Sequence, residues 1–324
     1  HVKRRRQRQM CIRDRSRKAF GQSISDFGSI QDKLATSAIL TYTLDSTCYS
    51  VIGKQTEAIN ELDKNDPEYY VKQGNTTEQY IAENSIVKVY GSEAAEELID
   101  HCFQIYGGYG FIEEYPMAQA YRDNRINKIW EGTNEINRML CGRAMITKAL
   151  SGEIGFKEYL EKVDVYCNNG LDSGYEGDLK TEVECVEAAK AVYAICLNES
   201  LSKHGQDIGT EQVIIENLAN ILIYAYVGDS TLSRVIQNKD LYVQKNQVVP
   251  ELCAKVYTAE QGIRVMEYAN KILNSIYDGE IPKELESKFA KLSKRLSLST
   301  DTIGLKKIIG EKVVEAGGYP VQSF

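Results

Sequence analysis

Residues 104–138 read QIYGGYGFIEEYPMAQAYRDNRINKIWEGTNEINR. This stretch joins a glycine-rich turn to a charged segment, and then to a Trp-Glu-Gly-Thr turn that carries one carboxylate, Glu131. A Glu followed by Gly and Thr at the start of a helix lies on a sharp turn, because Gly permits backbone angles that other residues avoid and Thr is a common helix cap. Such a turn brings a carboxylate and its backbone close to a ligand, a setting that suits a general base.

Composition and residue spacing predict an all-α protein around this stretch. The chain has 324 residues, which is enough for about two domains. A hydrophobic share of 43% and a charged share of 26% are typical of globular proteins and exclude general disorder. Prolines number only 5. Apolar or small residues recur every three or four positions, which is the period of one helix face, at Ile30, Leu34, Ala38, Thr41, Leu44, Cys48, Val51 and Ile52.

Three helices are expected before residue 107. The first starts near a cap at Asp26 and ends at a polar break over residues 63–75. The second is expected over about residues 76–90 and the third over about 92–106. Helical spacing continues beyond residue 151, interrupted by a glycine-rich loop at 168–177. The chain is therefore expected to be helical nearly throughout.

Motifs for several common site classes are missing from the sequence. It has no C-x-x-C pair, P-loop, nucleophile elbow or G-x-G-x-x-G. His101 lies one turn from Glu97, but a di-iron bundle site needs Glu-x-x-His motifs on two helices. The longest apolar run, 213–227, is short for a membrane span and contains polar residues. We expect no metal site, no transmembrane segment, reduced cysteines and a soluble protein.

Residues 1–16, HVKRRRQRQMCIRDRS, form a basic segment in a chain whose net charge is −7. A basic segment of this kind could bind nucleic acid or an anionic membrane. It contains no interleaved aromatic residues and no helical apolar stripe. We interpret it as non-native or disordered sequence and expect no nucleic-acid partner.

The ordered motifs of residues 104–138 resemble the C-terminal signature of the acyl-CoA dehydrogenases. That signature consists of a Q-I-x-G-G-x-G turn, then E-Y-P, Y-R-D-x-R-I and an aromatic-E-G-T-x-E-I turn, and all four occur here in order. Residues 17–35, RKAFGQSISDFGSIQDKLA, resemble the R-x-x-F-G segment of the same family. The resemblance implies a four-helix up-down bundle over residues 17–149. A second helical domain over 150–324 resembles the extension of the very-long-chain branch, and the family's N-terminal and middle domains have no counterpart in this sequence.

By this resemblance, Glu131 is the general base that removes the α-proton of an acyl-CoA thioester while the β-hydrogen leaves as hydride to FAD. A carboxylate with an ordinary pKa is a weak base for such a proton, so the site must exclude water around it. The resemblance places Trp130 and Gly132 at the substrate. A tryptophan in the protein core would look identical in the sequence, so that alternative stays open for Trp130.

Seven residues match positions that contact FAD in the family: Arg17, Phe20, Gln104, Gly107, Gly108, Thr133 and Glu135. In the family, the first two contact the FAD of a neighbouring subunit. Each residue also has an ordinary structural explanation. Glycines end helices, Thr133 with Glu135 suits a helix start, and Arg17 could be a surface residue beside a core phenylalanine.

The expected function is that of the C-terminal part of a FAD-dependent acyl-CoA dehydrogenase, which forms the α,β double bond of an acyl-CoA in fatty-acid β-oxidation. The resemblance implies an electron-transfer flavoprotein as partner, a homodimer or homotetramer, and a bacterial cytoplasm or an organelle matrix as location. This chain alone is expected to be incomplete and inactive. The alternative is a non-catalytic helical dimerisation or assembly module derived from that family, which the missing domains favour.

Overall fold

The computed structural model describes residues 17–321. The basic segment 1–16, which we expected to be non-native or disordered, lies outside the described residues. Within the described range, a short hairpin of strands β1 (Lys18–Ala19) and β2 (Gln22–Ser23) precedes a succession of helices. This arrangement confirms the predicted all-α fold.

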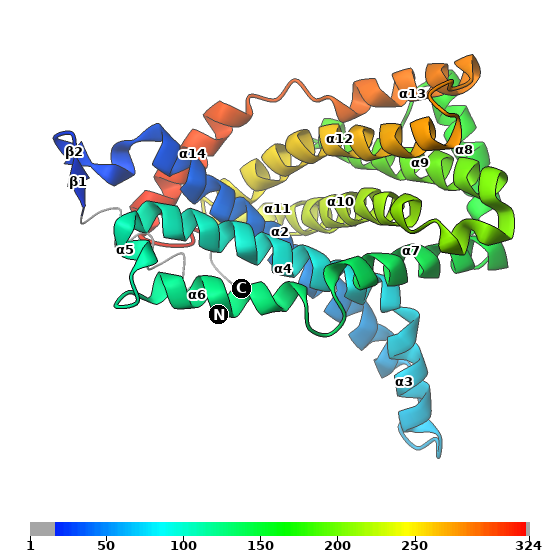
Figure 1. Cartoon of the computed structure of the whole chain (residues 1–324), viewed down its shortest axis with the longest axis horizontal. Coiled ribbons are helices and arrows are strands. Elements are labelled where there is room, and N and C mark those ends of the chain that lie inside the picture. The colour runs from blue at the N-terminus through cyan, green and yellow to red at the C-terminus, as the bar shows by residue number, and fades with distance from the viewer. Residues whose placement is uncertain (1–16, 322–324) are drawn as a thin grey trace.

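Helix α4 (Ile81–Tyr106) is the central member of the first bundle. It packs against α2 (Gly28–Asn60), α6 (Pro116–Arg125) and α7 (Asn134–Ser151). Figure 1 shows α2 and α4 side by side, with α6 and α7 end to end beneath them. Helix α3 (Tyr69–Gln79) extends away from the rest of the molecule in this view, and none of its residues is buried. The bundle therefore presents one helix that lacks a packed face.

The prediction of two helices over residues 76–90 and 92–106 was wrong, because α4 continues through Gly91. A glycine inside a helix costs about 1 kcal/mol relative to alanine, but here it lies against α2. A Cβ at Gly91 would lie in van der Waals contact with Leu44, 3.4 Å from its Cδ1 atom, so this position faces α2. The expected cap at Asp26 was also wrong, because Phe27 precedes α2 and no side chain caps that helix.

The second half of the chain is helical as well. The loop expected at residues 168–177 is confirmed, since α8 ends at Asn169 and α9 begins at Lys180. The helices here are α8 (Phe156–Asn169), α9 (Lys180–His204), α10 (Gln212–Gln237), α11 (Lys239–Gln244), α12 (Val249–Ile276), α13 (Lys283–Leu296) and α14 (Thr302–Ala316). Short helical turns connect several elements: η1 (Ile24–Asp26), α5 (Gly108–Phe111), η2 (Ile126–Lys128) and η3 (Gly205–Thr210).

Helix α10 joins the two halves of the chain. It packs against α2 and α7 from the first half and against α9 and α12 from the second, and Figure 1 shows it in the middle of the molecule. Helix α7 approaches α10 most tightly at Gly142, where a Cβ would overlap the Cγ2 atom of Ile215. Helix α14 returns to pack along α2. The first bundle and the later helices therefore share a buried interface.

The seven cysteines in the described part of the chain are all free thiols, and all except Cys48 are buried. Burial raises the pKa of the Cys141 and Cys185 thiols to about 12. These thiols therefore stay protonated and act as small apolar side chains. Across residues 17–321, no helix is both long and apolar enough to cross a membrane.

Candidate active site

The turn that carries Glu131 connects η2 to α7. Glu131 has a φ of 53° and Gly132 a φ of 78°, so two consecutive residues adopt left-handed backbone. A non-glycine residue in this conformation costs about 1–2 kcal/mol, and such residues persist only where their surroundings hold them. The turn ends at Thr133, where α7 begins. Glu131 itself is exposed, so its carboxylate is available to a ligand, but the described residues alone do not exclude water from it.

Two side chains hold this turn through its carbonyl groups. The Asn137 amide donates hydrogen bonds to the carbonyl oxygens of Glu131 at 3.3 Å, Gly132 at 2.9 Å and Thr133 at 3.1 Å. The Lys88 ammonium, from the middle of α4, donates to the Gly132 carbonyl at 2.6 Å. Three consecutive carbonyl groups are thus fixed from inside the bundle, which accounts for the persistence of the unusual backbone.

Glu131 lies on the wall of an open groove between α3, α4 and α7. The groove has a volume of about 700 Å³. We call it the Glu131 groove and define it by its lining residues: Tyr70, Gln73, Gly74, Thr77, Glu78, Ile81, Asn84, Ser85, Lys88, Glu131, Asn137 and Leu140. The two residues expected at the substrate, Trp130 and Gly132, are not part of this lining. Trp130 is 55% exposed at the surface beside the turn, so it is not a core residue.

Thr133 and Glu135 form the start of α7. The Thr133 hydroxyl accepts a hydrogen bond from the Ile136 amide at 3.3 Å, which confirms that Thr133 caps the helix. Hydrogen bonds from the backbone amide of Glu135 and from the Thr133 hydroxyl hold the pKa of the Glu135 carboxyl below its usual value. Both side chains face the amide groups of a helix N-terminus, a place that attracts polar and anionic ligand atoms.

Arg17, Gln104, Gly107 and Gly108 meet at the other end of α4. Helix α4 ends at Tyr106, and Gly107 has a φ of 59°, as expected for a glycine that stops a helix. A Cβ at Gly107 would lie 3.0 Å from a terminal nitrogen of Arg17, so the missing side chain makes room for the guanidinium. Gln104 and Gly108 are exposed beside them. An arginine next to bare backbone suits an anion such as a pyrophosphate.

Phe20 forms the tip of the β1–β2 hairpin. It has a φ of 51° and is 98% exposed, so nothing in the described part of the chain covers its ring. The ring meets Phe27 edge to face, with centroids 6.2 Å apart. The alternative that Phe20 is a core residue beside a surface arginine is wrong.

The predicted site residues therefore fall into two groups rather than one. The first group surrounds the Glu131 turn, which Lys88 of α4 contacts, and the second group includes Gln104 near the end of the same helix. At 1.5 Å per residue, these positions are about 24 Å apart along the helix axis. Lys88 and Asn137, which hold the Glu131 turn, were not among the residues predicted from the sequence. No motif links Lys88 to a turn that follows it by more than forty residues.

Partial burial lowers the pKa of the Lys88 ammonium, whereas the nearby carboxylates of Glu135 and Glu131 act in the opposite direction. Lys88 thus provides the Glu131 groove with a cation whose hydrogen bonds are directed at the turn. The site combines an exposed carboxylate, a fixed turn and an adjacent helix N-terminus, and this combination can accept a proton from a bound substrate.

Comparison with known protein families shows to which family this chain belongs. Two family models, both described as the acyl-CoA dehydrogenase C-terminal domain, match residues 4–146 and 188–288. The chain belongs to the acyl-CoA dehydrogenase family. The Glu131 turn lies inside the first match, whereas most of α9, all of α10 and α12 and the start of α13 lie in the second.

Relatives within the acyl-CoA dehydrogenase family match most of this chain. A probable acyl-CoA dehydrogenase of Bacillus subtilis is 28% identical over 94% of the chain and 51% of its own length. The very long-chain specific mitochondrial enzyme of Bos taurus is 32% identical over 68% of the chain and 34% of its own length. A solved acyl-CoA dehydrogenase from Bacillus anthracis, complexed with FAD, superposes with a TM-score of 0.90 and 28% identity over 99% of this chain and 54% of that one. The chain thus spans about half the length of the first of these relatives, and less of the second.

Proposed function

We propose that this chain is the C-terminal part of a flavin-dependent acyl-CoA dehydrogenase and that Glu131 is its general base. The observation that carries the proposal is the Glu131 turn, which holds an exposed carboxylate on a groove in a backbone conformation fixed by Asn137 and Lys88. The family membership supports the same assignment, as does the FAD with which the Bacillus anthracis relative is complexed.

In the proposed reaction, the Glu131 carboxylate takes the α-proton of an acyl-CoA thioester. The β-carbon gives up its hydrogen as hydride, and the electron pair of the α-C–H bond forms the new double bond. FAD, when bound, supplies the acceptor for that hydride. The backbone amide of Glu131 donates to none of the described residues, so it is available to the thioester oxygen, where negative charge develops.

The residues of both groups suit FAD. At the helix α4 terminus, the Arg17 guanidinium offers donors to a pyrophosphate, and Gly107, whose own amide bonds the Gln104 carbonyl, leaves space beside it. Gln104, Gly108 and the uncovered ring of Phe20 provide the neighbouring surface. At the α7 start, Thr133 and Glu135 offer polar groups beside the Glu131 turn.

As the family resemblance implies, we propose that Arg17 and Phe20 contact the FAD of a neighbouring subunit in a homodimer or homotetramer. We further propose a division at residues 149/150, an acyl-CoA substrate, and an electron-transfer flavoprotein as electron acceptor, as the family resemblance implies.

Activity should be tested in the natural protein that contains this chain, with Glu131→Gln as the variant. We expect acyl-CoA dehydrogenation to fall by about 10²–10⁴-fold, the usual contribution of a general base, while the flavin absorbance of the purified protein stays unchanged. Glu61→Gln, an exposed carboxylate outside the lining of the Glu131 groove, is the matched control and should retain activity. If Glu131→Gln keeps more than a tenth of the activity, Glu131 is not the base. If the wild type binds no flavin, the alternative of a non-catalytic assembly module is favoured.

A further inference from the structure

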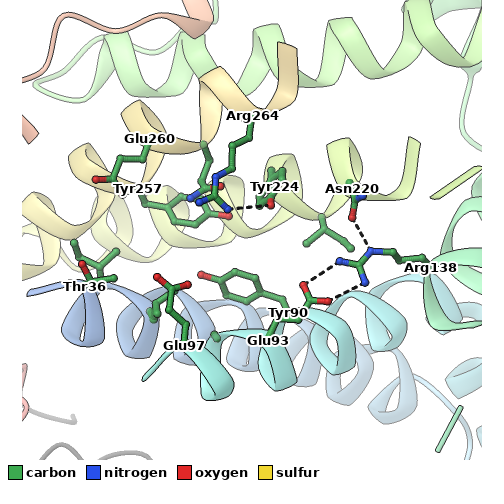
Figure 2. A pocket seen from close by; sticks show the side chains of 15 residues that line it. Thr36, Tyr90, Glu93, Glu97, Arg138, Asn220, Tyr224, Tyr257, Glu260 and Arg264 are labelled. Carbon is green, nitrogen blue, oxygen red and sulfur yellow. Dashed lines mark hydrogen bonds and ion pairs between the residues drawn. The ribbon is translucent and has the colours of Figure 1, made fainter. Parts of the chain in front are cut away.

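Asn220 and Arg138 link the second half of the chain to the helix that follows the Glu131 turn. The side-chain oxygen of Asn220, on α10, accepts a hydrogen bond from Arg138 Nε, on α7, at 2.6 Å. Figure 2 shows the Arg138 guanidinium between Asn220 and Glu93. Asn220 is 8% exposed, and the side chain of Arg138 is 13% exposed. Burial strengthens such a charge-assisted bond, because little water competes for either partner.

The rest of the Arg138 guanidinium is fixed by Glu93 on α4. The two terminal nitrogens donate to the two carboxylate oxygens of Glu93, each at 2.9 Å. Asn220 thus completes the set of acceptors by bonding the one nitrogen, Nε, that the fork-shaped pair leaves over. As a neutral amide, Asn220 accepts this bond without adding a second carboxylate to the pair.

Glu93 also connects this pair to the Glu131 turn. Its Oε1 atom accepts a hydrogen bond from the Asn134 amide at 3.1 Å. The Asn134 oxygen in turn accepts from Lys88 at 2.8 Å, and the same ammonium donates to the Gly132 carbonyl at 2.6 Å. Asn134 is 1% exposed, so the middle of this network is dry. A continuous run of hydrogen bonds therefore leads from α10 to the residue after Glu131.

We propose that Asn220 is a positioning residue, through which the C-terminal helices hold the Glu131 turn in the geometry that proton abstraction needs. This inference rests on the proposed role of Glu131. Asn220 touches neither substrate nor cofactor, and it acts by fixing Arg138, Glu93 and the first turn of α7. The later helices thereby contribute to catalysis as well as to stability, because small displacements of a catalytic group lower the rate strongly.

The test compares Asn220→Ala with Asn217→Ala. Asn217 lies one turn earlier on α10 and is only partly buried, and its side-chain amide bonds the Val213 carbonyl of its own helix. Hydrogen exchange is measured by mass spectrometry on the flavin-free 324-residue chain, over peptides that contain residues 130–140. We expect exchange of the Asn137 amide, which bonds the Thr133 carbonyl, to accelerate about tenfold in Asn220→Ala, as loss of one charge-assisted bond predicts. Asn217→Ala should exchange at the wild-type rate.

A third variant, Asn220→Gln, keeps a neutral acceptor oxygen and should restore slow exchange. Asn220→Leu, which keeps a similar side-chain volume and removes the acceptor, is the test variant if the alanine protein does not fold, and its exchange should also be faster than that of the wild type. In the natural protein that contains this chain, Asn220→Ala should lower kcat about tenfold while KM changes less than about twofold, and Asn220→Gln should recover most of the kcat. Unchanged exchange in Asn220→Ala, or equal losses in Asn220→Ala and Asn217→Ala, would overturn the proposal.

Hydrogen exchange requires no catalysis, so the two proposals can fail separately. If Asn220→Ala exchanges faster but Glu131→Gln stays active, Asn220 does hold the Glu131 turn and Glu131 is not the base. If Glu131→Gln is inactive but Asn220→Ala keeps the wild-type exchange rate and kcat, only the role of Asn220 is refuted.

Discussion

The contact between α7 and α10 at Gly142 gives a prediction with a definite sign. A Cβ at this position would overlap Ile215 Cγ2 and lie 3.2 Å from the Ile215 carbonyl oxygen. Ile215 is fully buried, so it has no free space into which it can retreat. Overpacking of this kind costs about 1–3 kcal/mol, and the better helix propensity of alanine offsets about 1 kcal/mol. We therefore expect Gly142→Ala to destabilise the protein by about 1 kcal/mol.

The assay is thermal denaturation followed by circular dichroism at 222 nm. For a chain of this size, a loss of about 1 kcal/mol corresponds to a Tm about 1–2 °C lower. Gly53→Ala is the matched control, because Gly53 also lies inside a helix and a Cβ there has no atom within 4 Å. The control should be more stable than the wild type by about 0.5–1 kcal/mol. A Gly142→Ala protein with a Tm equal to or above that of the wild type would refute the close approach of α7 to α10.

Two further predictions concern a cation and a histidine. Lys88→Met removes one of the two donors to the Gly132 carbonyl and the donor to the Asn134 oxygen, so the free energy of unfolding in urea should fall by about 1–2 kcal/mol, and Lys88→Arg should recover part of it. A full loss in both variants, or in neither, would contradict the role given to this ammonium. Burial lowers the pKa of His101 below its usual 6.5, so the unfolded chain binds a proton more readily, and the folded state loses stability as pH falls through about 6.5. His101→Gln should flatten the fall in Tm between pH 7 and 5.5, and an unchanged fall would argue against it.

Local patterns predicted the parts of the fold that depend on neighbouring residues. The apolar residues that start at Ile30 do lie on one long helix, although Ile52 is 56% exposed and α2 is buried on more than one face. The glycine at 107 does end α4. Thr133 caps α7 as its sequence context suggests. Each of these outcomes is decided within one or two helical turns, which is the range that sequence periodicity and capping rules describe.

Features that depend on distant residues could not be predicted in this way. Gly91 is typical of a helix boundary in the sequence, but α4 continues through it because the helix packs against α2, α6 and α7 on both sides of this position. The positive φ of Glu131 follows from hydrogen bonds by Asn137 and by Lys88, and the latter comes from a different helix. The bond from Asn220 spans 82 residues, and no local pattern records such a pair. The candidate site was thus recognised by its motif, while the groups that hold it in place became visible only in three dimensions.

Helix α3 has an energetic consequence for whatever occupies the Glu131 groove. An isolated helix shorter than about 12–15 residues is only marginally stable in water, and α3 has 11 residues, none of them buried. Its local unfolding therefore requires little free energy compared with that of the packed helices. The ordering of α3 and the occupation of the groove are linked equilibria, so part of the binding free energy offsets the chain entropy that α3 loses. A protein surface that packs on Tyr70 and Val71 of α3 would order this helix beforehand and so tighten binding without touching the ligand.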